Sequence, residues 1–262
     1  MENSSASATL QNSPATFPPK AFRWYATIPF LAGALFVFFV VIAVGGVAYT
    51  ISHGLDFSGA AKALSALPGV IIQSIAEVFV IAYIWLLLPS LAKTSLAGIG
   101  FRRISGAQLN AILVAIVLMF VIVTPLASAM ESILHFKTPE EAISVFTKTT
   151  GWRRAAFAFF GVVLAPVFEE SVFRLFLFNA MRQWWGFWPA AVVSSILFGL
   201  AHAQPPFTGA MLLSISFPLA VGGIVLCWVY ARTNNAWSSM ITHGGFNALS
   251  LILLILFPQL AK

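Results

Sequence analysis

One stretch of the sequence decides how this chain folds: Val167-Phe168-Glu169-Glu170-Ser171-Val172-Phe173-Arg174. It places two carboxylates and a guanidinium in the middle of an apolar run that extends from Ala155 to Ala180. A charged side chain at the centre of a membrane-spanning helix costs about 2.5–3.5 kcal/mol on insertion scales. We therefore expect this run to be a helix that carries the chemistry of the protein, with partners supplied by other helices.

The composition of the whole chain indicates a membrane protein. Of its 262 residues, 60% are hydrophobic and 8% are charged, whereas a soluble globular chain is about a quarter charged. This composition excludes a soluble domain. It predicts an all-α, polytopic membrane protein, a bundle of about seven transmembrane helices with six to eight as the range.

The charge of the chain indicates topology rather than a charged ligand. The net charge is +6, but the basic residues are spread over many short connections, so no groove for nucleic acid is expected. Lys and Arg beside the early helices favour a cytoplasmic N-terminus, and a bacterial inner membrane is the expected location. Four later cations fall on the opposite side and oppose this orientation: Lys137, Lys148, Arg153 and Arg154. The sequence does not indicate an oligomeric state.

Four parts follow one another along the chain: a disordered tail at 1–20, three transmembrane helices within 21–130, an interfacial segment at 131–152, and a catalytic transmembrane core at 153–262. Pro125 is expected to kink or end the third helix. In the interfacial segment, Thr138 as N-cap, Pro139 at the first helical position and Glu141 as capping-box partner predict a short amphipathic helix on the membrane surface.

Helix geometry assigns different roles to the two adjacent glutamates. Residues four apart lie on one face, so Glu170 and Arg174 are expected to form an ion pair within their own helix. Glu169 is turned about 100° away and is left free to act on a different neighbour. The alternative is that all three side chains form one buried salt-bridge cluster that only holds helices together.

Two later helices supply polar side chains that match this carboxylate. His202 lies four residues after Phe198, and Asn247 lies four residues after His243, so each pair shares a helical face. A desolvated glutamate acts as a general base on water, and a neighbouring histidine orients that water. A second histidine and an amide donate hydrogen bonds to a developing oxyanion. These are the parts of an amide hydrolase.

A zinc mechanism remains an alternative from the same residues. Two histidines and one carboxylate, here Glu169, His202 and His243, are a ligand set that zinc uses with an open position. Other intramembrane protease chemistries do not fit the sequence. It contains no His-Glu-x-x-His motif, its one aspartate is Asp56, and it lacks the Gly-x-Ser-Gly of a rhomboid-type serine site.

Three motifs resemble the signature of one family, the CAAX protease and bacteriocin-processing (CPBP, or Abi) membrane proteases, whose eukaryotic relatives are the type II CAAX prenyl endopeptidases. The motifs are Glu169-Glu170-x-x-x-Arg174, Phe198-x-x-x-His202 and His243-x-x-x-Asn247, in the order of the family. The resemblance covers roughly Arg153 to Phe257; the first three helices are similar only in being hydrophobic.

The resemblance implies an intramembrane endopeptidase fold and a role for each residue. Glu169 is the water-activating base, His202 is its partner, and His243 with Asn247 stabilises the oxyanion. Glu170, Arg174 and Phe198 support the motif helices. The substrate is expected to be a membrane-associated protein or peptide in contact with lipid. No cofactor is expected in this mechanism, and zinc belongs to the alternative.

Two other functions are compatible with the sequence. The first is a non-catalytic membrane protein, an immunity or scaffold factor that binds a partner within the bilayer. The second is a transporter that uses Glu169 and His202 as a proton relay, although the chain shows no internal repeat of the kind found in inverted-repeat transporters.

Overall fold

A computed structural model describes the protein over residues 24–56, 58–60, 67–135, 146–147, 149–203 and 207–257. The tail expected at 1–20 and the helix start expected at Thr138 lie outside these residues. The structural statements that follow concern the described part of the chain.

Helices are the only regular elements among the described residues. Six are long and apolar enough to cross a membrane, and a seventh apolar helix is shorter. In chain order these are α2 (Trp24–Ser52), α4 (Leu67–Leu91), α5 (Gly106–Leu134), a composite span over Gly151–Trp185, the shorter α10 (Phe187–Ala201), a second composite span over Gly209–Thr233, and α13 (Ala236–Leu256). The expected all-α polytopic membrane bundle is confirmed, and the protein is an integral membrane protein.

The two composite spans alternate between α-helix and wider π-helical turns. The first consists of α7 (Gly151–Phe159), η1 (Phe160–Leu164), α8 (Ala165–Glu170), η2 (Ser171–Phe178) and α9 (Asn179–Trp185). The second consists of α11 (Gly209–Met211), η3 (Leu212–Ser216) and α12 (Phe217–Thr233). Pro166 and Pro218 are the second residues after η1 and η3. Because proline has no N–H to donate to the preceding turn, the ladder of hydrogen bonds widens there.

Proline does not end α5. This helix begins at the N-cap Ser105, whose side chain forms a capping box with Gln108, and continues through Pro125 to Leu134. It therefore extends beyond the boundary expected at residue 130, and the first residues of the expected interfacial segment belong to the helix.

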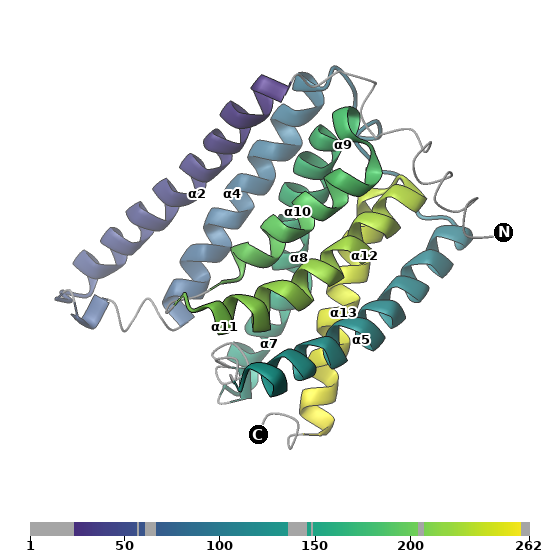
Figure 1. Ribbon diagram of the computed structural model, residues 1–262. Helices are drawn as coiled ribbons and strands as arrows, with labels where there is room; N and C mark the ends of the chain where they lie inside the picture. Colours follow the sequence, from purple (N-terminus) through teal and green to yellow (C-terminus); the bar gives the residue numbers. More distant parts are fainter. Residues whose placement is uncertain are drawn as a thin grey trace.

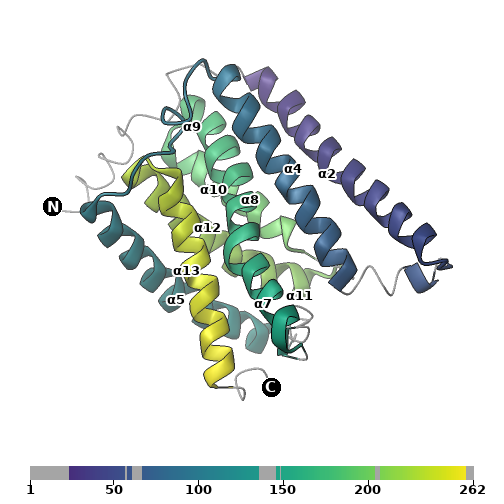
Figure 2. The same ribbon diagram turned by 180° about the vertical axis from the view of Figure 1, so that it is seen from behind.

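The first composite span lies inside the bundle. Its α8 and η2 parts contact α4 on one side, and α13 on the other, while η2 also packs against α10 and α12. Helix α2 lies at the flank and packs along α4 (Figure 1). The view from behind shows α4, α8 and α13 next to one another (Figure 2). The stretch Val167–Arg174 is thus surrounded by four other elements.

Glycines allow the helices around this span to approach closely. At Gly199 in α10, an added Cβ atom would overlap the backbone carbonyl oxygen of Ser216 in η3 and lie 3.2 Å from the backbone nitrogen of Ala220. Backbone atoms cannot rotate away as a side chain can. The contact between α10 and the second composite span therefore requires glycine at this position.

We predict that Gly199→Ala lowers the stability of the protein. An alanine inside a helix is otherwise favoured over glycine by about 1 kcal/mol, but overpacking against the Ser216 backbone costs about 1–3 kcal/mol. Thermal unfolding in detergent micelles, followed by tryptophan fluorescence, measures the change. The control is Gly106→Ala, where a Cβ atom meets nothing within 4 Å. An unfolding temperature for Gly199→Ala equal to that of Gly106→Ala would contradict the prediction.

Candidate active site

The centre of the site is a buried ion pair within the first composite span. The Nη1 atom of Arg174 donates to Oε1 of Glu170 over 2.8 Å, and the two side chains are 0% and 1% exposed. The predicted pairing of these two residues is present. Arg174 also donates through Nη2 to the carbonyl oxygen of Gly223 in α12 over 3.3 Å. The Arg174 guanidinium therefore links the first composite span to α12.

Glu169 points to a different group of side chains, as its turn around the helix requires. Its Oε1 atom lies 3.6 Å from Nε2 of His202, and its Oε2 atom lies 3.8 Å from Nε2 of His243. Oε2 is buried and has no hydrogen-bond partner among the described residues. The structure thus brings together a carboxylate and two imidazoles from three separate helical segments.

The other ring nitrogen of each histidine fixes its tautomer. Nδ1 of His202 lies 2.8 Å from the carbonyl oxygen of Phe198, which only accepts, so Nδ1–H donates. Nδ1 of His243 lies 3.1 Å from Oε1 of Glu170, a carboxylate already paired with Arg174, so it donates as well. In the neutral rings both Nε2 atoms are acceptors and face Glu169. A group with protons to donate, such as water, fits between them.

Phe198 connects the ion pair to the histidines. The guanidinium carbon of Arg174 lies 4.3 Å from the centre of its ring, within the range of a cation–π interaction. The same ring makes edge contacts with the imidazoles of His202 and His243, with centroids 4.8 and 5.8 Å apart. Phe198 is buried, so these three contacts define the position of its ring.

Asn247 lies beside the histidines and is anchored to the catalytic span. It lines the same cavity as Glu169, His202 and His243. Its Nδ2 atom donates to the carbonyl oxygen of Gly161 in η1 over 2.8 Å. A side-chain amide has two N–H groups, so one is engaged with the backbone and the second is available to a group in the cavity.

The site opens into a cavity of about 220 Å³. Besides the four polar residues and Phe198, five residues line it that the sequence did not single out: Met119, Val123, Leu219, Gly222 and Phe246. They belong to α5, α12 and α13, and nothing in an apolar helix marks which apolar side chain faces a site. The sequence therefore predicted the polar residues of the site but not the other residues that line the cavity.

Glu77 is a further buried carboxyl group near the site. It lies on α4, is 2% exposed, and accepts a hydrogen bond from Gln73 over 2.9 Å. It interacts electrostatically with Glu169, but it does not line the cavity. Glu77 is therefore not part of the cluster formed by Glu169, His202, His243 and Asn247.

The three residues of the zinc alternative lie close together. Within the described residues, no group of three or more His, Cys, Asp and Glu side chains is arranged to hold a metal. Nε2 of His202 lies 3.6 Å from one oxygen of Glu169, and Nε2 of His243 lies 3.8 Å from the other. In the zinc alternative these three side chains would hold the ion, which would supply an activated water.

Comparison with known proteins identifies the part of the chain that carries the site. Residues 151–249 match the family of type II CAAX prenyl endopeptidase Rce1-like proteins. Over 91 residues the chain is 29% identical to "Putative membrane peptidase YdiL" of Bacillus subtilis, covering 35% of this chain and 34% of that protein. It is 30% identical over 91 residues to "UPF0177 protein YbdI" of Lactococcus lactis subsp. lactis, covering 35% and 45%. The chain thus spans less than half the length of these relatives. No solved structure matches it.

We predict that Arg174→Met is more destabilising than loss of the whole ion pair. Removing one partner leaves the Glu170 carboxylate buried and uncompensated, which costs about 3–5 kcal/mol. In the double variant Glu170→Gln with Arg174→Met no buried charge remains, and His243 keeps an acceptor. Thermal unfolding in detergent compares the two proteins. A double variant that unfolds at or below the temperature of Arg174→Met would contradict this account.

Proposed function

We propose that this membrane protein is an endopeptidase, because residues 151–249 match the family of type II CAAX prenyl endopeptidase Rce1-like proteins. It hydrolyses a peptide bond of a membrane-associated protein or peptide. The observation that carries the proposal is the convergence of two imidazole Nε2 atoms on the Glu169 carboxylate in a cavity. The relatives' names describe those proteins; the activity of this chain is our inference.

In the proposed mechanism Glu169 is the general base. A water molecule between Glu169 and His202 donates one proton to the carboxylate while its oxygen attacks the scissile carbonyl carbon. Nε2 of His202 accepts a hydrogen bond from the second O–H group of the water. This bond directs a lone pair of the water oxygen at the carbonyl carbon. When the C–N bond breaks, the proton held by Glu169 passes to the leaving nitrogen. No group besides water is consumed.

The oxyanion of the intermediate is stabilised from the opposite wall. The second N–H of Asn247 donates to it, since the first is engaged with Gly161. His243 belongs to the same wall of the cavity as Asn247. Its Nδ1 atom lies 3.1 Å from the Glu170 carboxylate. The supporting role of Glu170 and Arg174 is to hold this ring.

The depth of the site explains why these groups are effective. Glu169 lies 17 residues after Trp152 and 16 residues before Trp185, so it is close to the middle of the first composite span. These two tryptophans are 67% and 55% exposed, as is typical of aromatic belts at the two membrane surfaces. The carboxylate is therefore near the middle of the bilayer, where the exclusion of bulk water strengthens electrostatic interactions.

The exposed cations favour the orientation that places the N-terminus in the cytoplasm. At the end of the bundle where α4 and α12 finish, four exposed cations occur: Lys93, Arg102, Arg103 and Arg232. None of the described carboxylates lies at this end; Asp56 and Glu131 lie at the other. By the positive-inside rule this basic end faces the cytoplasm, in a bacterial inner membrane.

We predict that Glu169→Gln abolishes cleavage and leaves the protein folded. Loss of the general base reduces the rate by about 10²–10⁴-fold. The assay incubates purified protein with a panel of peptides that includes a prenylated one, and thermal unfolding verifies the fold. Glu131→Gln is the matched control, because it makes the same change in a carboxylate at the end of α5.

Cleavage retained by Glu169→Gln would overturn the assignment. If Glu169→Ala and His202→Ala both keep the cellular phenotype of the wild type, the protein acts as a non-catalytic immunity or scaffold factor instead.

We predict further that a chelator leaves the activity unchanged. The proposed mechanism uses only side chains and water, so 1,10-phenanthroline removes nothing that it needs. The same peptide assay is run with and without the chelator, followed by added zinc. Loss of cleavage in the chelator with recovery in zinc would show that Glu169, His202 and His243 hold a metal-bound water.

A further inference from the structure

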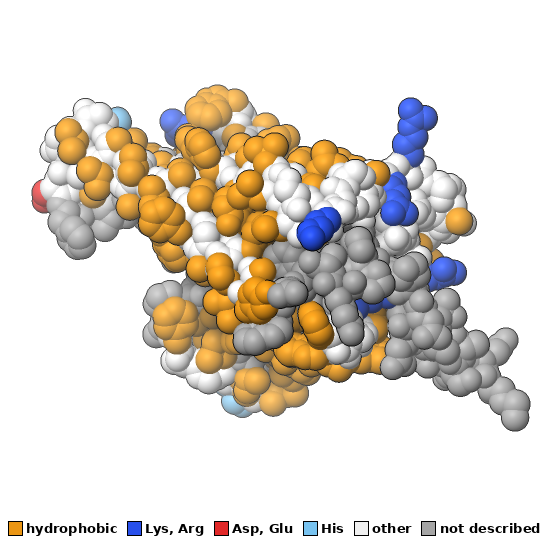
Figure 3. All heavy atoms as spheres, turned by 90° about the horizontal axis from the view of Figure 1, so that it is seen from above, with side chains coloured by type: hydrophobic (Ala, Val, Ile, Leu, Met, Phe, Trp, Pro, Cys, Tyr) orange, Lys and Arg blue, Asp and Glu red, His pale blue; other side chains and the backbone are white. Residues whose placement is uncertain are grey.

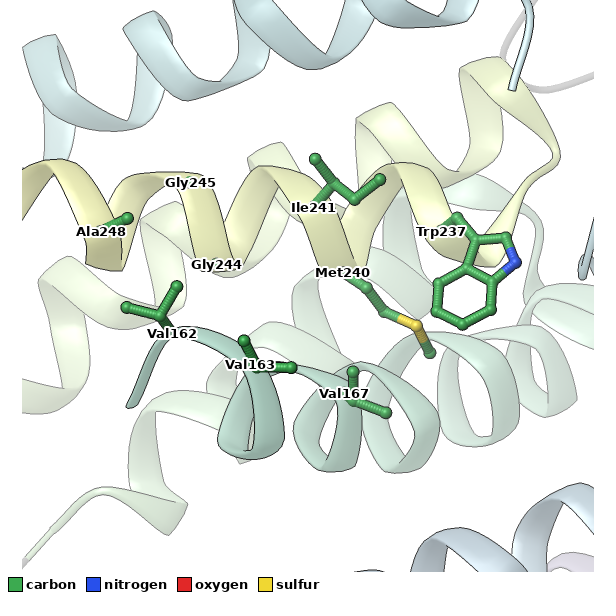
Figure 4. A pocket seen from close by; sticks show the side chains of 9 residues that line it. All are labelled: Val162, Val163, Val167, Trp237, Met240, Ile241, Gly244, Gly245 and Ala248. Carbon is green, nitrogen blue, oxygen red and sulfur yellow. The ribbon is translucent and has the colours of Figure 1, made fainter. Parts of the chain in front are cut away.

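A second hollow, separate from the catalytic cavity, lies on the outer side of α13. It has a volume of about 330 Å³ and an almost entirely apolar lining. Figure 4 shows Trp237, Ile241 and Ala248 along one wall, on α13, and Val163 and Val167 along the other, on η1 and α8. We call this hollow the α13 groove. It shares no lining residue with the catalytic cavity.

The α13 groove faces away from the chemistry and toward lipid. At 100° per residue, Ile241 lies about 160° around the helix from His243. Ile241 and Val163, which both line the groove, are each 43% exposed. In a membrane-spanning bundle, side chains exposed at this depth meet acyl chains.

The length of the groove matches one leaflet. From Trp237 to Ala248 the helix rises about 16 Å at 1.5 Å per residue. Half of the hydrocarbon core of a bilayer is about 15 Å thick. A single acyl chain lying along α13 therefore fills the groove and ends near the middle of the membrane.

At the end of the groove marked by Trp237 lies the connection between α4 and α5, residues 92–105, which carries Arg102 and Arg103. The loop is fixed on the start of α13: the backbone N–H of Ala236 donates to the carbonyl oxygen of Gly100 over 2.8 Å, and Asn235 donates to that of Arg102 over 3.0 Å. The ring of Phe101 lies 5.3 Å from that of Trp237, a groove residue. Arg102 and Arg103 are both exposed at this point.

Among the described residues, no carboxylate lies near the two arginines. All five described carboxylates lie either within the bundle or at its opposite end: Asp56, Glu77, Glu131, Glu169 and Glu170. The space-filling view onto this end shows several Lys and Arg side chains on its surface (Figure 3). Nε of Arg102 donates to the carbonyl oxygen of Ala97 over 2.8 Å, which leaves its two Nη groups to bind an external anion.

We propose that the α13 groove binds one anionic phospholipid, with an acyl chain along α13 and the phosphate on Arg102 and Arg103. The apolar walls accept the chain of any lipid, and the cations select the headgroup. Guanidinium groups suit this role because they bind phosphate with paired hydrogen bonds. The inference does not depend on the proposed proteolysis.

Occupation of the groove stabilises the contact between α13 and the catalytic span. Gly244 and Gly245 line the groove, and a Cβ atom at Gly244 would overlap the carbonyl oxygen of Val162. The two segments therefore approach each other through backbone atoms at the floor of the groove. A ligand that binds only the folded bundle raises its stability according to its concentration.

The test is a lipid titration of the full chain, purified in detergent and depleted of lipid. Thermal unfolding is measured with increasing phosphatidylglycerol or phosphatidylcholine. The wild type should gain stability from phosphatidylglycerol at an apparent Kd about 25-fold lower than from phosphatidylcholine, since each of the two cations near the headgroup contributes about five-fold. Arg102→Gln with Arg103→Gln should remove this preference, and Arg102→Lys with Arg103→Lys should keep most of it.

Matched controls separate charge from position. Arg153→Gln removes an exposed cation at the other end of the bundle and should behave as the wild type. Ala248→Phe fills the lower end of the groove and should weaken the binding of both lipids, whereas Val121→Phe, on the exposed face of α5, should not. Equal responses of the wild type to both lipids, or an unchanged preference in the double glutamine variant, would overturn the proposal.

Discussion

The constraint on which the structure depends is the burial of the charged pair Glu170 and Arg174 in the middle of a membrane span. In hydrocarbon neither charge can turn to water, so each must be satisfied by protein. Their mutual bond uses one oxygen and one Nη atom. Three further contacts surround the pair: the Gly223 carbonyl and the Phe198 ring on Arg174, and the Nδ1–H of His243 on the same oxygen of Glu170. Oε2 of Glu170 and Nε of Arg174 are buried without a hydrogen-bond partner among the described residues. One ion pair thereby draws α10, α12 and α13 around the catalytic span.

The same arrangement orients the groups to which the proposed mechanism assigns the chemistry. Because His243 donates from Nδ1 to Glu170, its Nε2 atom is directed at Glu169. Because Phe198 is held by Arg174, the helix that ends at His202 keeps its ring and its carbonyl in place. The two adjacent glutamates thus have different roles because they point to different sides of the helix. Glu170 holds Arg174 and His243 in place, and Glu169 lines the cavity.

Spacing along the chain predicted the contacts that arise within one helix and missed those that arise between helices. The i, i+4 rule found the Glu170–Arg174 pair, and hydropathy found the spans. The bond from His243 to Glu170 was not predictable, because periodicity does not state which helices are neighbours. The bond from Asn247 to the Gly161 carbonyl depends on the π-helical turn η1, for which Pro166 was the only local signal.

These missed contacts show why α13 is the helix whose placement matters most. Within two turns it makes three polar or backbone contacts besides the approach of His243 to Glu169: His243 on Glu170, Gly244 on the Val162 carbonyl, and Asn247 on the Gly161 carbonyl. Two are hydrogen bonds and one is a close backbone approach. Apolar burial has no large driving force between helices in lipid, and a small shift of α13 would separate His243 from both glutamates. A lipid chain packed along the outer side of α13 would add van der Waals contacts to this interface.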